Sequence, residues 1–287
     1  KLLYKKSRSK IQLKDIENLS IEEHSRYELR KLLEKFKNNI HVIVDIDKFS
    51  QLQKFSEIIR ELIKDKKFLF RTAASFLKTI SNIENNKKNK FYYSQLRLRD
   101  KLNQFLPGLI IIGSYTDVST QQLKKLLELN FFRAIELDVE KFYKIHFSKD
   151  KETQIFKFKK HILEAIRKTI KDSCIPVFFT SRKEKVLENN FNQMDFYNSL
   201  SYFIAEIVAD IKYEIGYLIS KGGITSNTIL NSSFKIDYVY LEGQICSGIS
   251  LVKAKLNNNN DLPVITFPGN LGNEHTLKEV WQTIENK

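Results

Sequence analysis

The sequence has little cysteine, proline and glycine, and it contains no long apolar run. Its two cysteines, Cys174 and Cys246, lie far apart, with no CxxC pair and no histidine at metal-binding spacing. This argues against a disulfide framework or a zinc site and indicates a reducing compartment, so we expect a cytoplasmic protein. Nine glycines and four prolines exclude a collagen-like or linker-like chain. No stretch of roughly 18 or more apolar residues occurs, so we expect no membrane-spanning segment.

Methionine is nearly absent too, and the one methionine, Met194, is not at the start of the chain. The opening residues, KLLYKKSR, are basic and no apolar segment follows them, which excludes a secretory signal peptide. We therefore expect the chain to begin partway through a longer protein. The remaining composition is typical of a folded protein, because 42% hydrophobic and 12% aromatic residues exclude wholesale disorder.

The chain carries a large excess of positive charge: 48 Lys and Arg against 34 Asp and Glu give a net charge of +14. Such a charge attracts nucleic acid, an anionic membrane surface or phosphorylated small molecules. The lysines are scattered along the sequence, which favours a generally basic composition over a dedicated surface. No RRM, KH or helix-turn-helix signature occurs, so the sequence disfavours nucleic acid and leaves an anionic small-molecule ligand open.

Short apolar strands alternate with amphipathic helices, which predicts an α/β fold of two lobes, with predominantly parallel or mixed sheets flanked by helices. We expect strands at 41–45, 67–70, 109–112, 134–138, 176–180, 217–220, 238–241 and 263–266. We expect helices over the first forty residues and at about 52–62, 120–128, 151–171, 195–212 and 276–284. In the first of these helices, Ser20 and Glu23 match a capping box.

The strand–helix alternation is interrupted by a polar and charged stretch, SNIENNKKNK at 81–90. A stretch without apolar periodicity is typical of a linker or an exposed excursion. We therefore divide the chain into a first domain at 1–85, a linker at 86–106 and a second domain at 107–287.

Three segments of the second domain share one form, in which a hydrophobic strand ends in Gly, Ser or Thr: 112–114, 222–226 and 268–272. Ligands of open α/β sheets bind at the carboxyl ends of the strands. Glycine allows close backbone approach, and free N–H groups favour an anion such as phosphate. Each turn alone is more typical of a tight connection, but three together favour a nucleotide-sized ligand. None matches GxxxxGK followed by Ser or Thr, or GxGxxG, which disfavours the P-loop and Rossmann dinucleotide sites.

Two arginines follow strands and are further candidates. Arg182, in TSR at 180–182, is suited to holding a phosphate or carboxylate, and a surface salt bridge explains it equally well. Arg71 precedes Thr72, two alanines and Ser75, small residues that also let a helix pack closely.

Catalytic and metal-binding patterns are otherwise weak. None of the five histidines has a patterned acidic or nucleophilic companion, which favours surface or capping roles for them. Asp45 and Asp47 follow a strand and share a face only if that strand continues, so they are a minor candidate for Mg²⁺. We assign no metal-ligand set from the sequence.

Taken in order, eight segments between about residue 40 and the end of the chain resemble the four-carbon acid sugar kinase family. They are FRTAASF at 70–76, GLIIIGS at 108–114, TQQL at 120–123, IELD at 135–138, TSR at 180–182, GGIT at 222–225, GQI at 243–245 with Gly248, and PGNLG at 268–272. Most are weak signals individually, and their ordered set is specific.

This resemblance implies an ATP-dependent kinase of acid sugars such as threonate and erythronate, with ATP and Mg²⁺ as cofactors. It implies that 1–85 is the remainder of a sugar-binding domain and that 107–287 is a nucleotide-binding domain. The residues implied to contact ATP are Ser114, Gly222, Gly223, Ile224, Thr225, Gly269, Asn270 and Gly272. The candidates on the substrate side are Arg71, Thr72, Ser75 and Arg182.

The sequence departs from the family pattern at three places. The acidic Asp-Asp-x-Thr-Gly motif that normally opens the sugar-binding domain is absent from this sequence. Ile224 stands where an acidic residue usually follows the Gly-Gly turn, and Phe267-Pro268 stand where Lys-Ser usually precedes the last glycine turn. We therefore expect a partial chain that binds ATP without full activity.

The alternative is a non-catalytic nucleotide-binding or structural protein derived from the family. For the active form, the expected partner is a small-molecule sugar acid. The sequence leaves the oligomeric state open.

Overall fold

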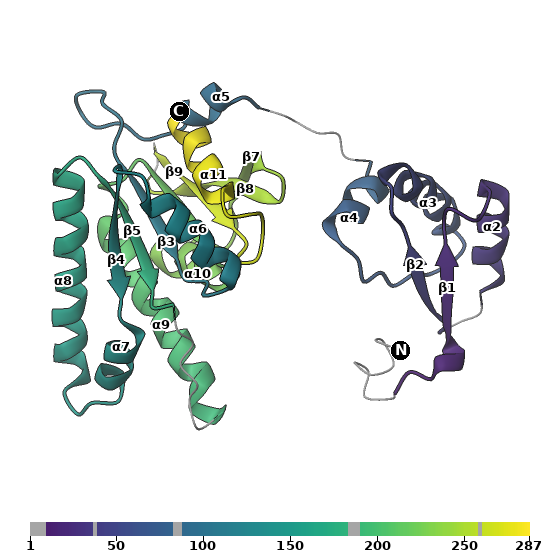
Figure 1. The fold of residues 1–287 in the computed structure, drawn as a ribbon, viewed down its shortest axis with the longest axis horizontal. Helices are drawn as coiled ribbons and strands as arrows, with labels where there is room; N and C mark the ends of the chain where they lie inside the picture. The colour runs from purple at the N-terminus through teal and green to yellow at the C-terminus, as the bar shows by residue number, and fades with distance from the viewer. Residues whose placement is uncertain (1–9, 37–38, 83–87, 183–189, 258–259) are drawn as a thin grey trace. The chain divides into compact units, whose positions relative to one another are not determined.

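The computed structural model describes residues 10–36, 39–82, 88–182, 190–257 and 260–287 (Figure 1). The chain forms two compact units, Lys1–Asn85 and Asn86–Lys287. Among the described residues, no helix is both long enough and apolar enough to cross a membrane.

The first unit is built around two parallel strands, β1 and β2, whose pairing runs from Ile16 opposite His41 to Ser20 opposite Asp45. Its elements are the short 3₁₀ helix η1 (Leu13–Asp15), β1 (Ile16–Ser20), α2 (Arg26–Lys35), β2 (His41–Asp45), α3 (Phe49–Leu62) and α4 (Ala74–Ile80). The unit has a small hydrophobic core that includes Leu29 and Ile58.

Two sequence predictions for this unit are wrong. Ser20 ends strand β1, and the capping box is formed five residues later, where the Glu28 N–H donates to Ser25 Oγ at 3.3 Å. The pattern Ser-x-x-Glu occurs at both places, and pairing with β2 decides between them. Residues 67–70 pair with no described strand, and the Phe68 and Phe70 rings instead stack at 5.7 Å.

The second unit contains a seven-stranded mixed sheet in the order β4-β5-β3-β6-β9-β8-β7. The first five strands are parallel, and β8 and β7 are antiparallel to their neighbours. The strands are β3 (Gly108–Ile112), β4 (Phe132–Leu137), β5 (Ile175–Thr180), β6 (Tyr217–Lys221), β7 (Tyr240–Cys246), β8 (Ile249–Lys255) and β9 (Asp261–Phe267). The predicted α/β class with a mostly parallel sheet is confirmed.

Helices cover both faces of this sheet (Figure 1). They are α5 (Lys90–Gln95), α6 (Asp117–Leu127), α7 (Val139–His146), α8 (Lys151–Lys171), α9 (Asn190–Ile211), α10 (Gly223–Thr228) with the π-helical turn η2 (Ile229–Ser233), and α11 (Thr276–Glu285).

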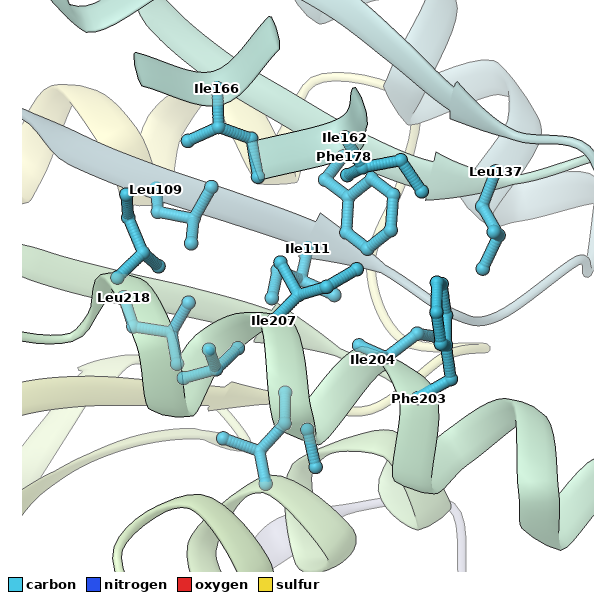
Figure 2. Packing of buried hydrophobic residues seen from close by; sticks show 14 of the residues in the cluster. Leu109, Ile111, Leu137, Ile162, Ile166, Phe178, Phe203, Ile204, Ile207 and Leu218 are labelled. Atoms are coloured by element: carbon cyan, nitrogen blue, oxygen red, sulfur yellow. The ribbon is translucent and has the colours of Figure 1, made fainter. Parts of the chain in front are cut away.

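Strand β3 shows why the layers form. Successive side chains of a strand point to opposite faces, so Leu109 and Ile111 pack with α7, α8 and α9, while Ile110 and Ile112 pack with α6 and α11. Figure 2 shows the first of these clusters around Ile111 and Phe178. Burying each such side chain contributes about 1.5–3 kcal/mol. The central strands are therefore fixed in place, and so are the turns that follow them.

Some elements were not predicted. The strand expected at 238–241 proves to be a hairpin, β7 and β8, which turns at Gly248 with a positive φ of 74°. Helices α5 and α7 were also missed. The segment 86–106 contains α5, where Tyr93 is buried, and its Arg97 forms an ion pair with Glu285 of α11 at 3.0 Å.

Candidate functional site

The turns after β3, β6 and β9 lie at one edge of the sheet, because these strands are parallel neighbours. Backbone hydrogen bonds connect them directly. The N–H groups of Gly113 and Ser114 donate to the Lys221 carbonyl at 3.0 and 3.3 Å, and the Gly222 N–H donates to the Phe267 carbonyl at 2.9 Å. The structure therefore brings the three predicted turns together.

The chain leaves this edge in two directions. After β3 it enters α6, whose Leu123 and Leu126 pack on one face of the sheet. After β6 it enters α10 and η2, whose Ile229 packs on the other face. In open α/β sheets, ligands bind at the carboxyl ends of two neighbouring strands that are followed by helices on opposite faces of the sheet.

The turn after β9, residues 268–273, has its carbonyl groups bonded toward the interior of the unit. The Lys221 ammonium group donates to the Pro268 carbonyl at 3.0 Å. The Thr116 and Ser119 hydroxyls donate to the Gly269 carbonyl at 2.9 and 2.7 Å. These contacts hold the turn from beneath.

The second half of the turn is held by one buried side chain. Gln122 Nε2 donates to the carbonyls of Leu271 and Asn273 at 3.0 and 2.7 Å. Gln122 lies in the TQQL segment at 120–123, for which the sequence predicted no role.

This bonding determines where the N–H groups of the turn point. In a trans peptide, a carbonyl and the following N–H point in opposite directions. With the carbonyls of residues 268, 269 and 271 directed inward, the N–H groups of Gly269, Asn270 and Gly272 point outward. Within the described residues these three N–H groups donate to no protein acceptor. Outward-pointing N–H groups on a short turn form an anion-binding concavity.

Two of the glycines are required by contacts within the protein. A Cβ on Gly269 would lie 2.4 Å from Ser114 Oγ, and one on Gly113 would lie 2.1 Å from Thr225 Oγ1. Glycine at these positions lets the turns approach each other closely. Thr225 is accordingly buried, and Ser114 is half-buried.

Gly223 differs, because a Cβ there would meet no atom within 4 Å. The space beside it is open, and its neighbour Ile224 is 72% exposed. Among the predicted site glycines, Gly223 is therefore the one with most room for a ligand to approach.

Lys221 is a residue of this site that the sequence analysis missed. It is the last residue of the buried strand β6 and is 0% exposed. Its carbonyl accepts from the turn after β3, its ammonium group donates to the turn after β9, and the turn after β6 begins at the next residue, Gly222. Burial lowers the pKa of Lys221 from 10.5 to about 8. The available signal was a lysine that directly follows an apolar strand and precedes Gly-Gly.

Arg182 lies at the same edge, at the end of β5. Its guanidinium donates to the carbonyls of Ser114, at 2.8 Å, and Thr180, at 2.9 Å. Burial lowers the pKa of Arg182 to about 10, against a smaller opposing effect of Glu136. Predicted as a substrate-side residue, Arg182 lies beside the Ser114 turn. Among the described residues, neither Arg182 nor Lys221 forms an ion pair with an acid.

The other predicted substrate-side residues, Arg71, Thr72 and Ser75, lie in the first unit and are exposed. Arg71 and Thr72 precede Ala73, the N-cap of α4, and Ser75 is the second residue of that helix. Asp45 and Asp47, which follow β2, are exposed as well.

The three turns fit phosphate groups better than a divalent cation. Residues 113–114, 222–226 and 268–272 offer amides and hydroxyls, and no carboxylate. Mg²⁺ in proteins is usually held by one or two carboxylates together with substrate phosphates. Among the described residues, no group of three or more His, Cys, Asp and Glu side chains is placed to hold a metal ion. The turns thus fit phosphate groups and do not by themselves fit Mg²⁺.

Two adjoining hollows, of about 240 and 210 Å³, lie elsewhere, between α7, α8 and α9. Both are lined by Lys151, Ile155 and Glu206. They contain none of the glycine turns, and we place the candidate site at the turns because the anion-binding groups converge there.

Solved structures share this fold at low sequence identity. One is a putative tRNA synthase of Salmonella typhimurium LT2, with a TM-score of 0.61 and 13% identity over 91% of this chain and 58% of that one. Another is a Haemophilus influenzae protein of family DUF1537, with a TM-score of 0.54 and 14% identity over 94% of this chain and 60% of that one.

A Bordetella bronchiseptica DUF1537 protein, a domain-swapped dimer with bound citrate, has a TM-score of 0.49 and 12% identity over 94% of this chain and 59% of that one. The chain thus spans about three fifths of the length of each of these three structures. No curated protein sequence matches it.

A family model for a nucleotide-binding C-terminal domain matches residues 109–277, which are more than half of the chain. The match begins in β3 and ends in α11, so it includes the three glycine turns, Lys221 and Arg182. The chain therefore belongs to the nucleotide-binding C-terminal domain family.

Proposed function

We propose that the second unit binds ATP at the carboxyl ends of β3, β6 and β9, as the nucleotide-binding part of an ATP-dependent kinase of four-carbon acid sugars such as threonate or erythronate. The observation that carries this proposal is the turn at 268–273. Its carbonyls accept from side chains of the unit, and its N–H groups at Gly269, Asn270 and Gly272, which donate to no described protein acceptor, are available to a phosphate.

Three further features support phosphate binding at this edge. The Ser114 and Ser119 hydroxyls lie 3.0 Å apart beside the turn and can reorient toward a ligand. Open space adjoins Gly223 on the neighbouring turn. Lys221 and Arg182 add positive charge at a partly dry site, where an anion is stabilised more strongly than in water.

The acceptor side of the proposal rests on the first unit. We assign 1–85 to the remainder of a sugar-binding domain, 86–106 to a linker and 107–287 to the nucleotide-binding domain. Arg71 is suited to a sugar-acid carboxylate as a two-pronged donor, with Thr72 and Ser75 available for hydroxyl groups. All three side chains are exposed to solvent.

Nucleotide titrations of the purified chain test the proposal. We expect ATP and ADP to raise the melting temperature and to bind in calorimetry, with or without Mg²⁺, and adenosine to bind at least tenfold more weakly because it lacks phosphates. The matched variant is Asn270→Pro, which removes one of the outward N–H groups at an exposed position. Equal affinity for ADP and adenosine would contradict phosphate recognition at this edge.

A second function, a non-catalytic nucleotide-binding or structural protein derived from the same family, is favoured by one observation. The turns contribute no carboxylate, and Ile224 is an exposed apolar residue in the middle of them. Coupled assays with a panel of four-carbon acids separate the two functions when the chain is fused behind a segment that carries the family's acidic motif. ATP binding by this fusion without phosphorylation of any acid would support the second.

A further inference from the structure

One residue joins the three turns of the candidate site. The carbonyl of Lys221 accepts the N–H groups of Gly113 and Ser114, and its ammonium group donates to the Pro268 carbonyl. In the sheet, Lys221 is paired with Ile112 of β3 on one side and Phe267 of β9 on the other. It therefore occupies the middle of the edge where the phosphate is expected.

The environment of Lys221 is unusual for a lysine. Its side chain is fully buried, and its ammonium nitrogen lies 3.8 Å from the centre of the Phe267 ring. Lysines are almost never fully buried unless they are paired with an acid. Within the described part of the chain, no carboxylate pairs with Lys221.

The Pro268 carbonyl does not need the lysine, because it also accepts the Leu271 N–H at 3.3 Å. A methionine of similar length at position 221 would therefore leave no orphaned carbonyl in the turn. Burying a cation at this place is costly to the fold and is not required to satisfy the backbone, so its charge requires another explanation.

We propose that Lys221 is the positioning residue of the nucleotide-phosphate site: its ammonium group fixes the Pro268 carbonyl, so that the N–H group of Gly269 faces the phosphate, and it places a positive charge behind the turn. This inference rests on the proposed function. Lys221 acts through the turn and not by touching the nucleotide, because its side chain is covered.

The charge of Lys221 gives the proposal a pH signature. No charged side chain perturbs its pKa, which burial alone sets near 8. The side chains opposite it on β3 and β9, Ile112 and Phe267, do not titrate. Arg182, which also reaches β3, has the higher pKa, about 10, so it loses its charge later than Lys221 and remains mostly charged at pH 9.5. Nucleotide affinity should therefore fall as the pH rises through 8.

The test is calorimetric titration of the full chain with ADP at pH 7.0, 8.0 and 9.5, where its phosphates are largely ionised and any remaining ionisation adds negative charge as the pH rises. The wild type should lose about tenfold in affinity between pH 7.0 and 9.5. Lys221→Met should bind about tenfold more weakly at pH 7.0 and show no loss at higher pH. Lys221→Arg should bind within about threefold of the wild type at pH 7.0 and keep that affinity at pH 9.5.

The control is Lys124→Met, which removes the same charge from an exposed position on α6 and should bind and titrate like the wild type. ADP binding that is equal in wild type and Lys221→Met, with the same pH profile, overturns the role of Lys221 and leaves the proposed function standing. Absence of ADP and ATP binding by the wild type overturns both. If Lys221→Arg does not fold, the wild-type profile and Lys221→Met decide the matter.

Discussion

Lys221 and Phe267 are paired in the β6–β9 ladder, with the Lys221 ammonium nitrogen 3.8 Å from the centre of the Phe267 ring. The resemblance to acid sugar kinases implies a lysine where this chain has Phe267. In this chain a lysine lies on the neighbouring strand, at the paired position, with its ammonium group over the Phe267 ring. A desolvated cation–π contact contributes about 2 kcal/mol and helps to hold the charge there.

Lys221→Met should stabilise the second unit at pH 7. Burial lowers the pKa of Lys221 from 10.5 to about 8, so the unfolded state binds more protons between those values and the unfolding free energy rises with pH across that window. Below pH 8 the full cost of the buried charge, about 3 kcal/mol, is present. Methionine removes much of it.

The fluorescence of Trp281 provides the measurement, because this sole tryptophan is buried on α11 of the second unit. In urea unfolding, the stability advantage of Lys221→Met should be largest at pH 7 and shrink between pH 8 and 10. A variant less stable than the wild type at pH 7 would show that the contacts of the ammonium group outweigh the cost of burying it.

Gly223→Val should weaken ADP binding by at least about tenfold, or ~1.4 kcal/mol, without changing the fold. An added Cβ at Gly223 meets nothing within 4 Å of the protein, so only a bound phosphate would be obstructed. Calorimetry measures the affinity and Trp281 fluorescence the stability. Asn227→Ala, at an exposed position of the same helix α10, is the control and should bind normally. Unchanged affinity in the folded Gly223→Val protein would sink the assignment of this turn.

Glu242→Gln should destabilise the second unit by about 2–3 kcal/mol and loosen α5. The Glu242 carboxylate accepts from Lys88 at 2.5 Å and Lys253 at 2.7 Å, and also from the Tyr92 hydroxyl. Burial would raise the pKa of Glu242, but these hydrogen bonds outweigh it and hold that pKa at about 2. The stabilisation is therefore present above about pH 4.5 and is lost as the pH falls toward 2.

Hydrogen exchange of the α5 amides and urea unfolding at pH 7 and pH 4 measure this effect. The difference in unfolding free energy between wild type and Glu242→Gln should begin to narrow as the pH falls below 4.5. Glu128→Gln is the control, since Glu128 pairs with Lys125 on the surface of α6 and such pairs contribute less than about 1 kcal/mol. Equal losses of unfolding free energy in Glu242→Gln and Glu128→Gln would contradict a special role for Glu242.

The parts of the site that the sequence predicted are those with local signals. An apolar run followed by Gly, Ser or Thr is visible in the sequence at 112–114, 222–226 and 268–272. Parallel pairing then brings the turns to one edge of the sheet without further information. The long helix α8 was predicted for the same reason, because its apolar period runs through the entire element.

What the sequence could not provide depends on register and side-chain direction. Lys221 is buried because β6 lies between β3 and β9, and no single segment of the sequence predicts the order of the strands in the sheet. The inward bonding of the carbonyls at 268–273 requires Gln122 and Ser119, which are about 150 residues away along the chain. The capping box at Ser25 was missed because Ser20 and Glu23 offer the same pattern.

Both cysteines should be present as free thiols. The structure records Cys174 as buried and Cys246 as half-buried, and both are free. Burial raises the pKa of the Cys246 thiol, so it should react slowly with a thiol reagent in the folded protein at pH 7.5. Counting with the same reagent should give two thiols after denaturation without reductant. An oxidised pair would contradict a reducing compartment.

The purified chain should bind nucleotide and yet phosphorylate neither threonate nor erythronate above background. Phosphoryl transfer needs the acceptor hydroxyl held in line with the γ-phosphate and, in most kinases, a base that receives its proton. The glycine turns contain no carboxylate, and the substrate-side residues Arg71, Thr72 and Ser75 include none either. The absence of a positioned base, by itself, typically lowers the rate 10²–10⁴-fold.

Coupled ATP-hydrolysis and mass-spectrometric assays of product measure this outcome. In the resembled family, the base is expected from an acidic motif at the start of the sugar-binding domain. Fusing a segment that carries this motif ahead of Lys1 should therefore restore turnover, and the same fusion with the motif's aspartates changed to asparagine should not. Robust phosphorylation by residues 1–287 alone would show that the chemistry resides in groups of this chain, and Asp45 and Asp47, which follow β2, would be the first to test.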